Sequence, residues 1–232
     1  MNRRSFAALA ALVVAAPAGA SLAKASPPAT WDNLVHVKSK RVQAVYLLPG
    51  ADFRGYTKVM LDPTEVAFAK DWQRDLNTST VGLSRRISDD DAQKIADQVR
   101  TGFQEIFAKA YTDAGYPVVA IPARDVLRVR TAVANLTIDA PDRDTIGRSY
   151  SFSVQAGAAT LILEARDSLT GALLGRAVDA RAAGDMTGGL RTSVSNRADF
   201  TRLFQRWAKA STDGLATLKA LSPISEGGET RK

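Results

Sequence analysis

The sequence predicts an α+β fold in which two long helices pack on one face of an antiparallel-rich or mixed sheet of about five to six strands. Three observations support this prediction. Several segments alternate between apolar and polar residues, as half-buried strands do. Two other segments carry apolar residues every three or four positions, as amphipathic helices do. The order along the chain is strands, helix, strands, helix, which is typical of helices packed on one face of a sheet.

Three extended segments open the predicted domain. Arg41–Leu48 reads as a first strand, and a Pro-Gly pair closes it. Tyr56–Leu61 reads as a second strand. Glu65–Trp72 is expected to continue the sheet, although its two faces are not cleanly divided into apolar and polar.

The clearest element is a helix over 89–112, whose apolar stripe comprises Ala92, Ile95, Val99, Phe103, Ile106 and Ala110. Ser88 is expected to cap it, with Asp91 completing an acidic capping box. Negative charge suits the positive end of a helix dipole, so the three aspartates at this helix start require no metal ion. Gly115 and then Pro117 stop the helix.

A short strand at Pro117–Ile121 and a long strand at Asp125–Ile138 are predicted next. In the long strand, one face carries Leu127, Val129, Thr131 and Val133. Arg128 and Arg130 lie on the other face, so we expect one side to be buried and the other to be wet.

A hairpin follows, with strands at Ala158–Arg166 and Ala172–Ala182. Its turn begins with Asp167, whose side chain can accept backbone N–H bonds, and ends with Gly171, which can adopt positive φ. The turn and strand signals therefore agree on one antiparallel pair.

The second long helix is predicted over Arg197–Leu221, with an apolar stripe of Phe200, Leu203, Phe204, Trp207, Leu215 and Leu218. Two polar segments, Pro141–Gln155 and Gly184–Asn196, lack such a stripe and are expected to be loops. These elements together place a single α+β domain at 41–221.

Both ends of the chain are expected to lie outside this domain. Residues 1–25 have the order of a bacterial export signal, because two arginines precede an apolar run at Phe6–Ala16 and small residues follow. The run is about half of what a bilayer span requires, so cleavage after Ala25, or five residues earlier, is expected. An extended lead-in then covers 26–40, and a disordered polar tail covers 222–232.

The expected location is the periplasm or the medium. Arg3 and Arg4, with a phenylalanine two places later, resemble the twin-arginine export motif. An ordinary secretory signal fits the same residues equally well. The sequence therefore leaves the export route open.

The composition limits the partners. The chain has no cysteine, which excludes a thiol nucleophile, a cysteine metal site and a lipidated cysteine anchor. The formal net charge is +7, but the predicted signal contains Arg3, Arg4 and Lys24 and no acid. The remaining positive charge is mild and interspersed with acids, so no nucleic-acid partner is expected.

No constellation of residues predicts catalysis, a metal site or a cofactor. His36 is the only histidine, and the chain lacks a Gly-x-Ser-x-Gly motif. Asp139, Asp142 and Asp144 suggest a calcium loop, but Ile146 stands where an oxygen ligand is required. A solvated turn explains these aspartates better.

Two groups of side chains are candidates for partner binding. Arg202, Arg206 and Lys209 lie at positions i, i+4 and i+7, which predicts one exposed stripe that would suit an anionic headgroup, a glycan or an acidic protein. Tyr150 and Phe152 lie in a polar segment and would form exposed contacts. The alternatives are a solvated helix face and two aromatic anchors that fold inward.

Three stretches carry a family resemblance. They are Asp52–Tyr56 running into Val59–Pro63, Arg128–Arg130 after a Tyr-Pro-Val-Val segment, and Asp167–Gly171. On these residues the chain resembles a bacterial family of small exported proteins known only as a domain of unknown function, many of whose members are lipoproteins. The resemblance covers about Val42–Leu218. It supplies no catalytic residues, and the absence of cysteine departs from the lipoprotein members.

The sequence therefore favours an exported, soluble and non-enzymatic protein that binds an envelope protein or an anionic envelope component. The alternative is a hydrolase or small-ligand enzyme that uses carboxylates such as Asp139 or Glu164 in a pocket. Two carboxylates of raised pKa in a deep pocket would favour the enzyme. A shallow surface with exposed aromatic and basic side chains would favour binding.

Overall fold

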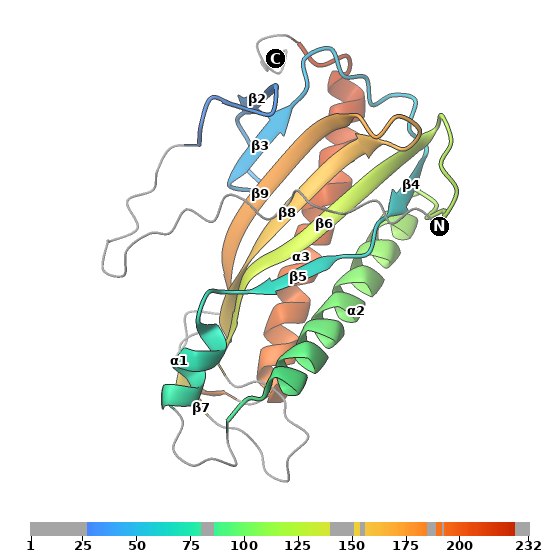
Figure 1. Cartoon of the computed structure of the whole chain (residues 1–232). Coiled ribbons are helices and arrows are strands. Elements are labelled where there is room, and N and C mark those ends of the chain that lie inside the picture. Colours follow the sequence, from blue (N-terminus) through green and yellow to red (C-terminus); the bar gives the residue numbers. More distant parts are fainter. Residues whose placement is uncertain are drawn as a thin grey trace, which may run out of the picture.

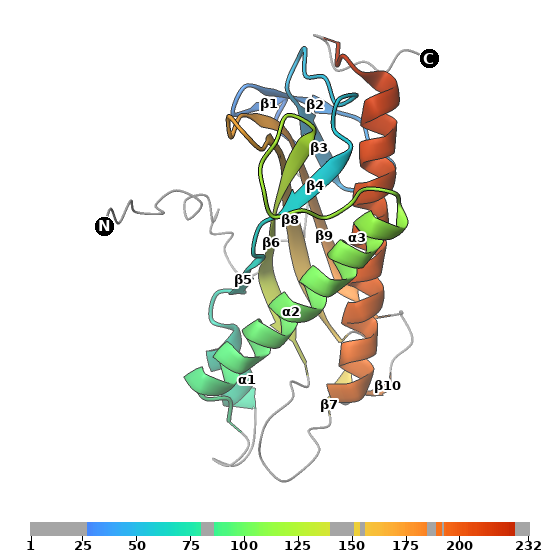
Figure 2. The ribbon, with the colours of Figure 1, turned by 90° about the vertical axis from the view of Figure 1, so that its right-hand side faces the viewer.

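The computed structural model describes residues 27–79, 86–139, 151–153, 156–184, 189–191 and 193–225. A mixed sheet of eight strands forms its body, and two long helices cover one face of that sheet (Figures 1 and 2). The strands are β1 (Thr30–Trp31), β2 (Leu34–Val37), β3 (Ala44–Leu47), β4 (Lys58–Leu61), β5 (Glu65–Phe68), β6 (Val126–Ile138), β8 (Gly157–Asp167) and β9 (Leu173–Ala183). They follow the order β1-β2-β3-β9-β8-β6-β4, and β5 also pairs with β6.

The helices of the described chain are α1 (Trp72–Ser79), α2 (Asp89–Asp113) and α3 (Ser193–Leu221). A separate two-stranded sheet pairs β7 (Ser151–Ser153) with β10 (Gly189–Arg191). The predicted architecture is confirmed in its coarse form, because a mostly antiparallel sheet packs against two long helices. The sheet is mixed, since β4 and β5 pair with β6 in parallel.

The sheet is larger than the predicted five to six strands, partly because the expected lead-in over 26–40 contains β1 and β2. Leu34 in β2 is fully buried, and Val35 pairs with Leu47 of β3. Strands this short carry too few residues to show an alternating pattern in the sequence. The pairing of β2 with β3, and of β1 with β2, defines them instead.

The three longest strands, β6, β8 and β9, form the centre of the sheet (Figure 1). Gly157 opens β8 at a φ of 143°, where an added Cβ would lie 1.9 Å from the carbonyl oxygen of Thr137. This close approach lies beside an irregularity of β6 at which Asn135 has a φ of 49°. Only glycine fits the first position of β8.

The predicted hairpin between β8 and β9 is confirmed. Asp167 Oδ1 accepts the backbone N–H of Leu169 at 3.1 Å and of Thr170 at 2.7 Å. Gly171 closes the turn at a φ of 73°, and its N–H donates to the carbonyl of Asp167 at 2.9 Å. The stretch Asp167–Gly171, one of the three that carry the family resemblance, is therefore a turn.

The predicted helices are confirmed with small changes at their ends. Ser88 caps α2 through a capping box with Asp91. The buried aromatic residues of the two long helices meet over the sheet, where the rings of Phe103 and Phe204 lie 5.2 Å apart. The apolar stripes predicted from the sequence thus form one core between the helices and the sheet.

Several predicted elements differ from the structure. The segment Glu65–Trp72 does not continue as strand to its end, because β5 stops at Phe68 and α1 begins at Trp72. Pro117–Ile121 forms no strand but a single bridge between Val118 and Val59. The expected loop Gly184–Asn196 contains β10 and the start of α3, and the expected loop Pro141–Gln155 contains β7.

The predicted tail also begins too early. Ile224 is buried, its carbonyl accepts the N–H of Gly50 at 2.8 Å, and its own N–H donates to Ala51 at 2.9 Å. The hydroxyl of Ser222 accepts the N–H of Phe53 at 2.8 Å. Residues 222–225 therefore pack against the chain after β3, while 226–232 and the predicted signal at 1–25 lie outside the described residues.

Candidate binding cavity

A cavity of about 980 Å³ lies between the inner face of the sheet and the C-terminal half of α3, which runs along that face (Figure 2). The sheet supplies apolar side chains such as Leu47, Val129 and Leu161. Trp207 of α3 and Ile224 beyond it close other sides. Protein interiors are close-packed, with few voids larger than a water molecule. A mostly apolar cavity of this size is therefore a candidate binding site.

Small residues on α3 make room for this cavity. The helix face that carries Trp207 continues through Ala210, Ser211 and Gly214 before it reaches Leu218. At helical spacing these positions face the same side, where a packed helix normally carries large apolar residues. A Cβ added at Gly214 would meet no atom within 4 Å. The sequence of α3 therefore leaves space that the sheet does not fill.

A buried carboxylate fixes one wall of the cavity. Asp179 on β9 is 2% exposed and accepts the indole N–H of Trp207 at 2.8 Å. It also accepts the backbone N–H of Gln43 at 2.9 Å and Nε of Arg181 at 2.5 Å. Three donors satisfy this buried carboxylate, and the hydrogen bond from Trp207 holds the indole ring in place.

The polar groups inside the cavity are paired hydroxyls. Tyr111 Oη lies 2.5 Å from Ser211 Oγ, and both residues line the cavity. Burial raises the pKa of Tyr111 to about 12, so its hydroxyl stays neutral near pH 7. Among the described residues that line the cavity, none is acidic. Its interior is thus apolar and uncharged.

One exposed part of the lining is cationic. Lys38, Ser39, Lys40 and Arg41, in the loop between β2 and β3, all line the cavity and are exposed, so they mark its mouth. The hydroxyl of Ser39 accepts the N–H of Arg41 at 3.2 Å and holds the loop in a turn. Arg41 Nε lies 3.9 Å from Oδ2 of Asp213 on α3, so the two sides of the mouth face each other.

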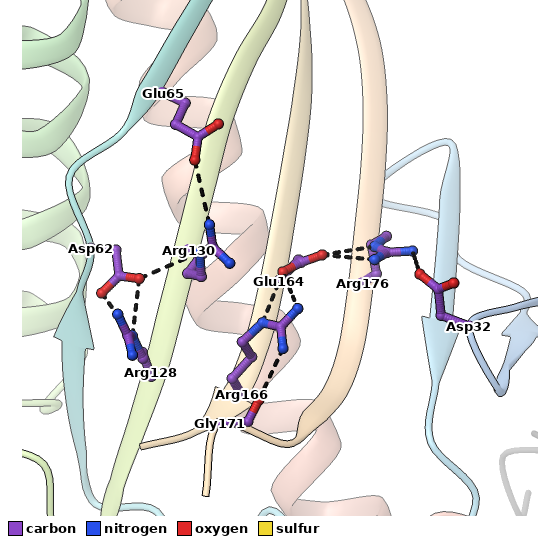
Figure 3. A network of polar contacts seen from close by, with 9 residues as sticks. All are labelled: Asp32, Asp62, Glu65, Arg128, Arg130, Glu164, Arg166, Gly171 and Arg176. Carbon is purple, nitrogen blue, oxygen red and sulfur yellow. Dashed lines mark hydrogen bonds and ion pairs between the residues drawn. The ribbon is translucent and has the colours of Figure 1, made fainter. Parts of the chain in front are cut away.

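A second polar cluster lies on the face of the sheet opposite α3 (Figure 3). Glu164 is 3% exposed and accepts from Arg166 Nε at 2.9 Å and from Arg176 Nη2 at 2.7 Å. Arg176 also binds Asp32 at 2.8 Å, and its guanidinium lies 4.1 Å from the ring centroid of Trp31. The β1–β2 segment therefore covers this part of the face.

The ionisation of Glu164 follows from these contacts. Burial raises its pKa, but the hydrogen bonds from Arg176 and Arg166 outweigh that effect and hold the pKa below its ordinary value. A general acid near pH 7 requires the opposite shift. Glu164, a candidate for carboxylate catalysis from the sequence, is instead an ionised member of a structural network.

The predicted wet face of the long strand is confirmed. Arg128 and Arg130 are partly exposed and both pair with Asp62, at 2.9 Å and 3.5 Å. Arg130 also lies 3.4 Å from Glu65 (Figure 3). These ion pairs tie the parallel strand β5 and the end of β4 to β6.

The α3 residues predicted to bind a partner lie on its outer surface. Lys209 Nζ donates to Asp213 at 3.1 Å, which places it beside the cavity mouth. Arg202 pairs with Asp199 one turn earlier. Arg202 and Arg206 also line a hollow of about 500 Å³ together with Arg181. The stripe is therefore divided between two local environments.

The other sequence candidates are placed as follows. Tyr150, Asp142 and Asp144 lie outside the described residues, and Phe152 is described only as part of the backbone of β7. His36 lies in β2, with its ring 5.3 Å from that of Tyr46. Within the described ranges, no group of three or more acidic or histidine side chains could hold a metal ion.

Comparison with known proteins assigns the family. The model of a protein family of unknown function, DUF3313, matches residues 24–211. The chain belongs to the DUF3313 family. This confirms the resemblance seen in the sequence, and the family has no assigned function. No curated protein matches the chain.

Solved structures with a similar chain course include three bacterial proteins. A PelC dodecamer from Paraburkholderia phytofirmans is 15% identical with a TM-score of 0.36, over 73% of this chain and 98% of that one. XCC0632 from Xanthomonas campestris, a DUF330 protein, is 11% identical with a TM-score of 0.37, over 71% and 83%. A minor lipoprotein from Acinetobacter baumannii is 11% identical with a TM-score of 0.32, over 68% and 94%. In the described part of the chain, no helix is long and apolar enough to cross a membrane.

Sequence reasoning missed the cavity and its mouth. The cationic residues Lys38, Lys40 and Arg41 lie where the expected lead-in over 26–40 meets the expected first strand, Arg41–Leu48. One signal was present, since Ala210, Ser211 and Gly214 interrupt the large apolar residues of α3. A run of small residues on a helix face has several structural meanings, so it could not identify a cavity without the facing sheet.

Proposed function

We propose that the protein is an exported binding protein of the bacterial envelope that takes up an apolar or amphipathic small molecule between the sheet and α3. The observation that carries the proposal is the apolar cavity of about 980 Å³. Sites for small molecules typically have volumes of about 300–1,000 Å³, mostly apolar walls and a few polar groups. A ligand in this space would gain dispersion contacts with the apolar walls.

Binding fits the cavity better than carboxylate-dependent hydrolysis does. Within the described residues the cavity lining contains no acid, and the buried Glu164 lies on the opposite face of the sheet. The two hydroxyls inside, Tyr111 and Ser211, are bonded to each other. Such walls can enclose an apolar molecule without placing a base beside it.

The location and the macromolecular partner are part of the same proposal. The export signal expected at 1–25 and the family resemblance support a soluble periplasmic or secreted protein. The stripe of Arg202, Arg206 and Lys209 is the proposed contact with an anionic envelope component, together with Tyr150 and Phe152. Periplasmic fractionation with N-terminal sequencing tests the location, and the expected first residue is Ser26 or Ser21.

Uptake is tested with the neutral apolar dye N-phenyl-1-naphthylamine, titrated into protein produced from the full-length chain. We expect saturable binding with one dye per protein. Gly214→Phe places a ring in the open space beside α3 and should weaken dye binding at least tenfold. Gly102→Phe is the matched control, because Gly102 also has no atom within 4 Å of an added Cβ but lies on α2, away from the cavity. Equal dye binding by wild type and Gly214→Phe would overturn the proposal.

A further inference from the structure

The mouth of the cavity carries more positive than negative charge. Lys38, Lys40 and Arg41 line it from the β2–β3 loop, and Lys209 of α3 binds the carboxylate of Asp213 beside it. Asp213 contacts two of these cations and lies 3.9 Å from Arg41 Nε and 3.1 Å from Lys209 Nζ. One carboxylate thus forms ion pairs with two cations at this opening.

The two lysines of the loop supply the rest of the positive charge at the mouth. In the described part of the chain, Lys38 and Lys40 form no ion pair. Both lysines flank Ser39, whose hydroxyl accepts the N–H of Arg41, and both line the same opening. Like charges held together repel, and an anion placed between them relieves that repulsion.

The interior differs sharply from the mouth. Behind the loop, the walls are formed by side chains such as Val37, Leu163 and Leu215, and no cation lies among the residues that the strands and α3 contribute to the lining. Charge is therefore concentrated at one end of an apolar space. This polarity matches a molecule with an apolar body and a charged end.

From this arrangement we infer that the ligand is an amphiphile whose acyl or alkyl chain fills the cavity and whose anionic headgroup binds at Lys38, Lys40 and Arg41. The inference rests on the proposed function, because it requires that the cavity takes up a ligand. A carboxylate and a phosphate share the required chemistry, since both accept charge-assisted hydrogen bonds from lysine and arginine. A fatty acid would supply the first and a lysophospholipid the second.

The test is displacement of N-phenyl-1-naphthylamine by a series of twelve-carbon amphiphiles below their micelle concentrations. The series comprises dodecanoate, dodecyl phosphate, dodecylphosphocholine and dodecyltrimethylammonium. We expect each anionic member to bind at least tenfold more tightly than the cationic one, with the zwitterion between them. Tighter binding of dodecyl phosphate than of dodecanoate would indicate a phospholipid source, and the reverse order would indicate a fatty acid. Equal affinity for dodecanoate and dodecyltrimethylammonium would overturn the inference.

A variant separates headgroup recognition from uptake. The triple substitution Lys38→Gln, Lys40→Gln and Arg41→Gln should weaken dodecanoate binding at least tenfold more than it weakens binding of the neutral dye. These side chains are exposed, and Ser39 still closes the turn, so the fold should tolerate the change. The control Lys70→Gln, Arg86→Gln and Arg124→Gln removes the same charge from exposed sites that do not line the cavity.

Failure of the inference and failure of the proposed function give different results. If wild-type protein does not bind the dye, or if Gly214→Phe does not weaken dye binding, the proposed uptake is wrong. If the dye binds as expected but the lysine and arginine triple variant retains wild-type affinity for dodecanoate, only the headgroup assignment is wrong.

Discussion

Trp207 on α3 donates its indole N–H to Asp179 on β9 over 2.8 Å, so a buried carboxylate joins the long helix to the centre of the sheet beside the cavity. This bond sets the position of the ring that forms one cavity wall. It also explains how α3 can carry small residues in the next turns and still be held against the sheet. Asp179 also accepts the backbone N–H of Gln43, so the fixed aromatic wall lies close to the cationic β2–β3 loop.

Removal of this carboxylate should destabilise the fold. Asp179→Ala leaves the indole N–H of Trp207 and the N–H of Gln43 without their buried acceptor, and we expect a loss of about 2–4 kcal/mol in the free energy of unfolding. Chemical denaturation measures the change. Asp213→Asn, at an exposed ion pair, is the control and should change stability by less than about 1 kcal/mol. An Asp179→Ala protein as stable as the control would contradict the assigned role.

The open space beside Gly214 predicts a stabilising substitution. Glycine in a helix interior costs about 1 kcal/mol relative to alanine, and an added Cβ meets no atom within 4 Å here. Gly214→Ala should therefore raise the free energy of unfolding by about 1 kcal/mol. Gly102→Ala on α2 should do the same, which gives a matched comparison by thermal or chemical denaturation. Destabilisation by Gly214→Ala alone would show that the cavity is filled by neighbouring side chains.

The β8–β9 turn predicts losses of stability of different size for two substitutions at one position. Gly171 has a φ of 73°, which a β-branched residue adopts poorly. Gly171→Val should lower the free energy of unfolding by about 1–3 kcal/mol. Gly171→Asn should lower it by less than about 1 kcal/mol, because asparagine tolerates this conformation. Thermal melts compare the two, and a Gly171→Val protein with wild-type stability would contradict the turn assignment.

The Glu164 network predicts a pH dependence. The folded-state pKa of Glu164 lies below its ordinary value of 4.5, so its ionised form stabilises the fold above that pH. That contribution is lost as the pH falls through the folded-state pKa. Glu164→Gln should therefore cost about 2–4 kcal/mol at pH 7, and the difference from wild type should shrink below about pH 4.5.

Urea denaturation of both proteins between pH 7 and pH 3 measures this effect. Glu65→Gln is the control, because Glu65 forms an exposed ion pair with Arg130 at 3.4 Å and should contribute less than about 1 kcal/mol. A Glu164→Gln difference that is constant over the whole pH range would show that ionisation plays no part in the network.

Local signals in the sequence predicted the elements that local bonds define. The capping box of Ser88 and Asp91 starts α2, and the turn from Asp167 to Gly171 joins β8 to β9. The capping box and the turn each involve only a few consecutive residues, so both can be recognised directly in the sequence. The apolar stripes of both long helices also follow from their spacing alone.

The missed features depend on contacts between distant segments. β2 exists because Val35 pairs with Leu47, and Ile224 is ordered because it bonds to the chain at Gly50 and Ala51. The cavity requires the sheet, α3 and the β2–β3 loop together. No single segment carries a pattern that records such an arrangement, apart from the small residues that precede Leu218 on α3.

The central claim is that the space between the sheet and α3 holds a ligand, and electron density in crystals grown with dodecanoate tests it most directly. The account predicts continuous density for the alkyl chain between Leu161 and Gly214, with the carboxylate next to Lys38, Lys40 and Arg41. Dodecanoate bound only on the outside of the protein, with Trp207 and its neighbours packed across an occluded cavity, would contradict it.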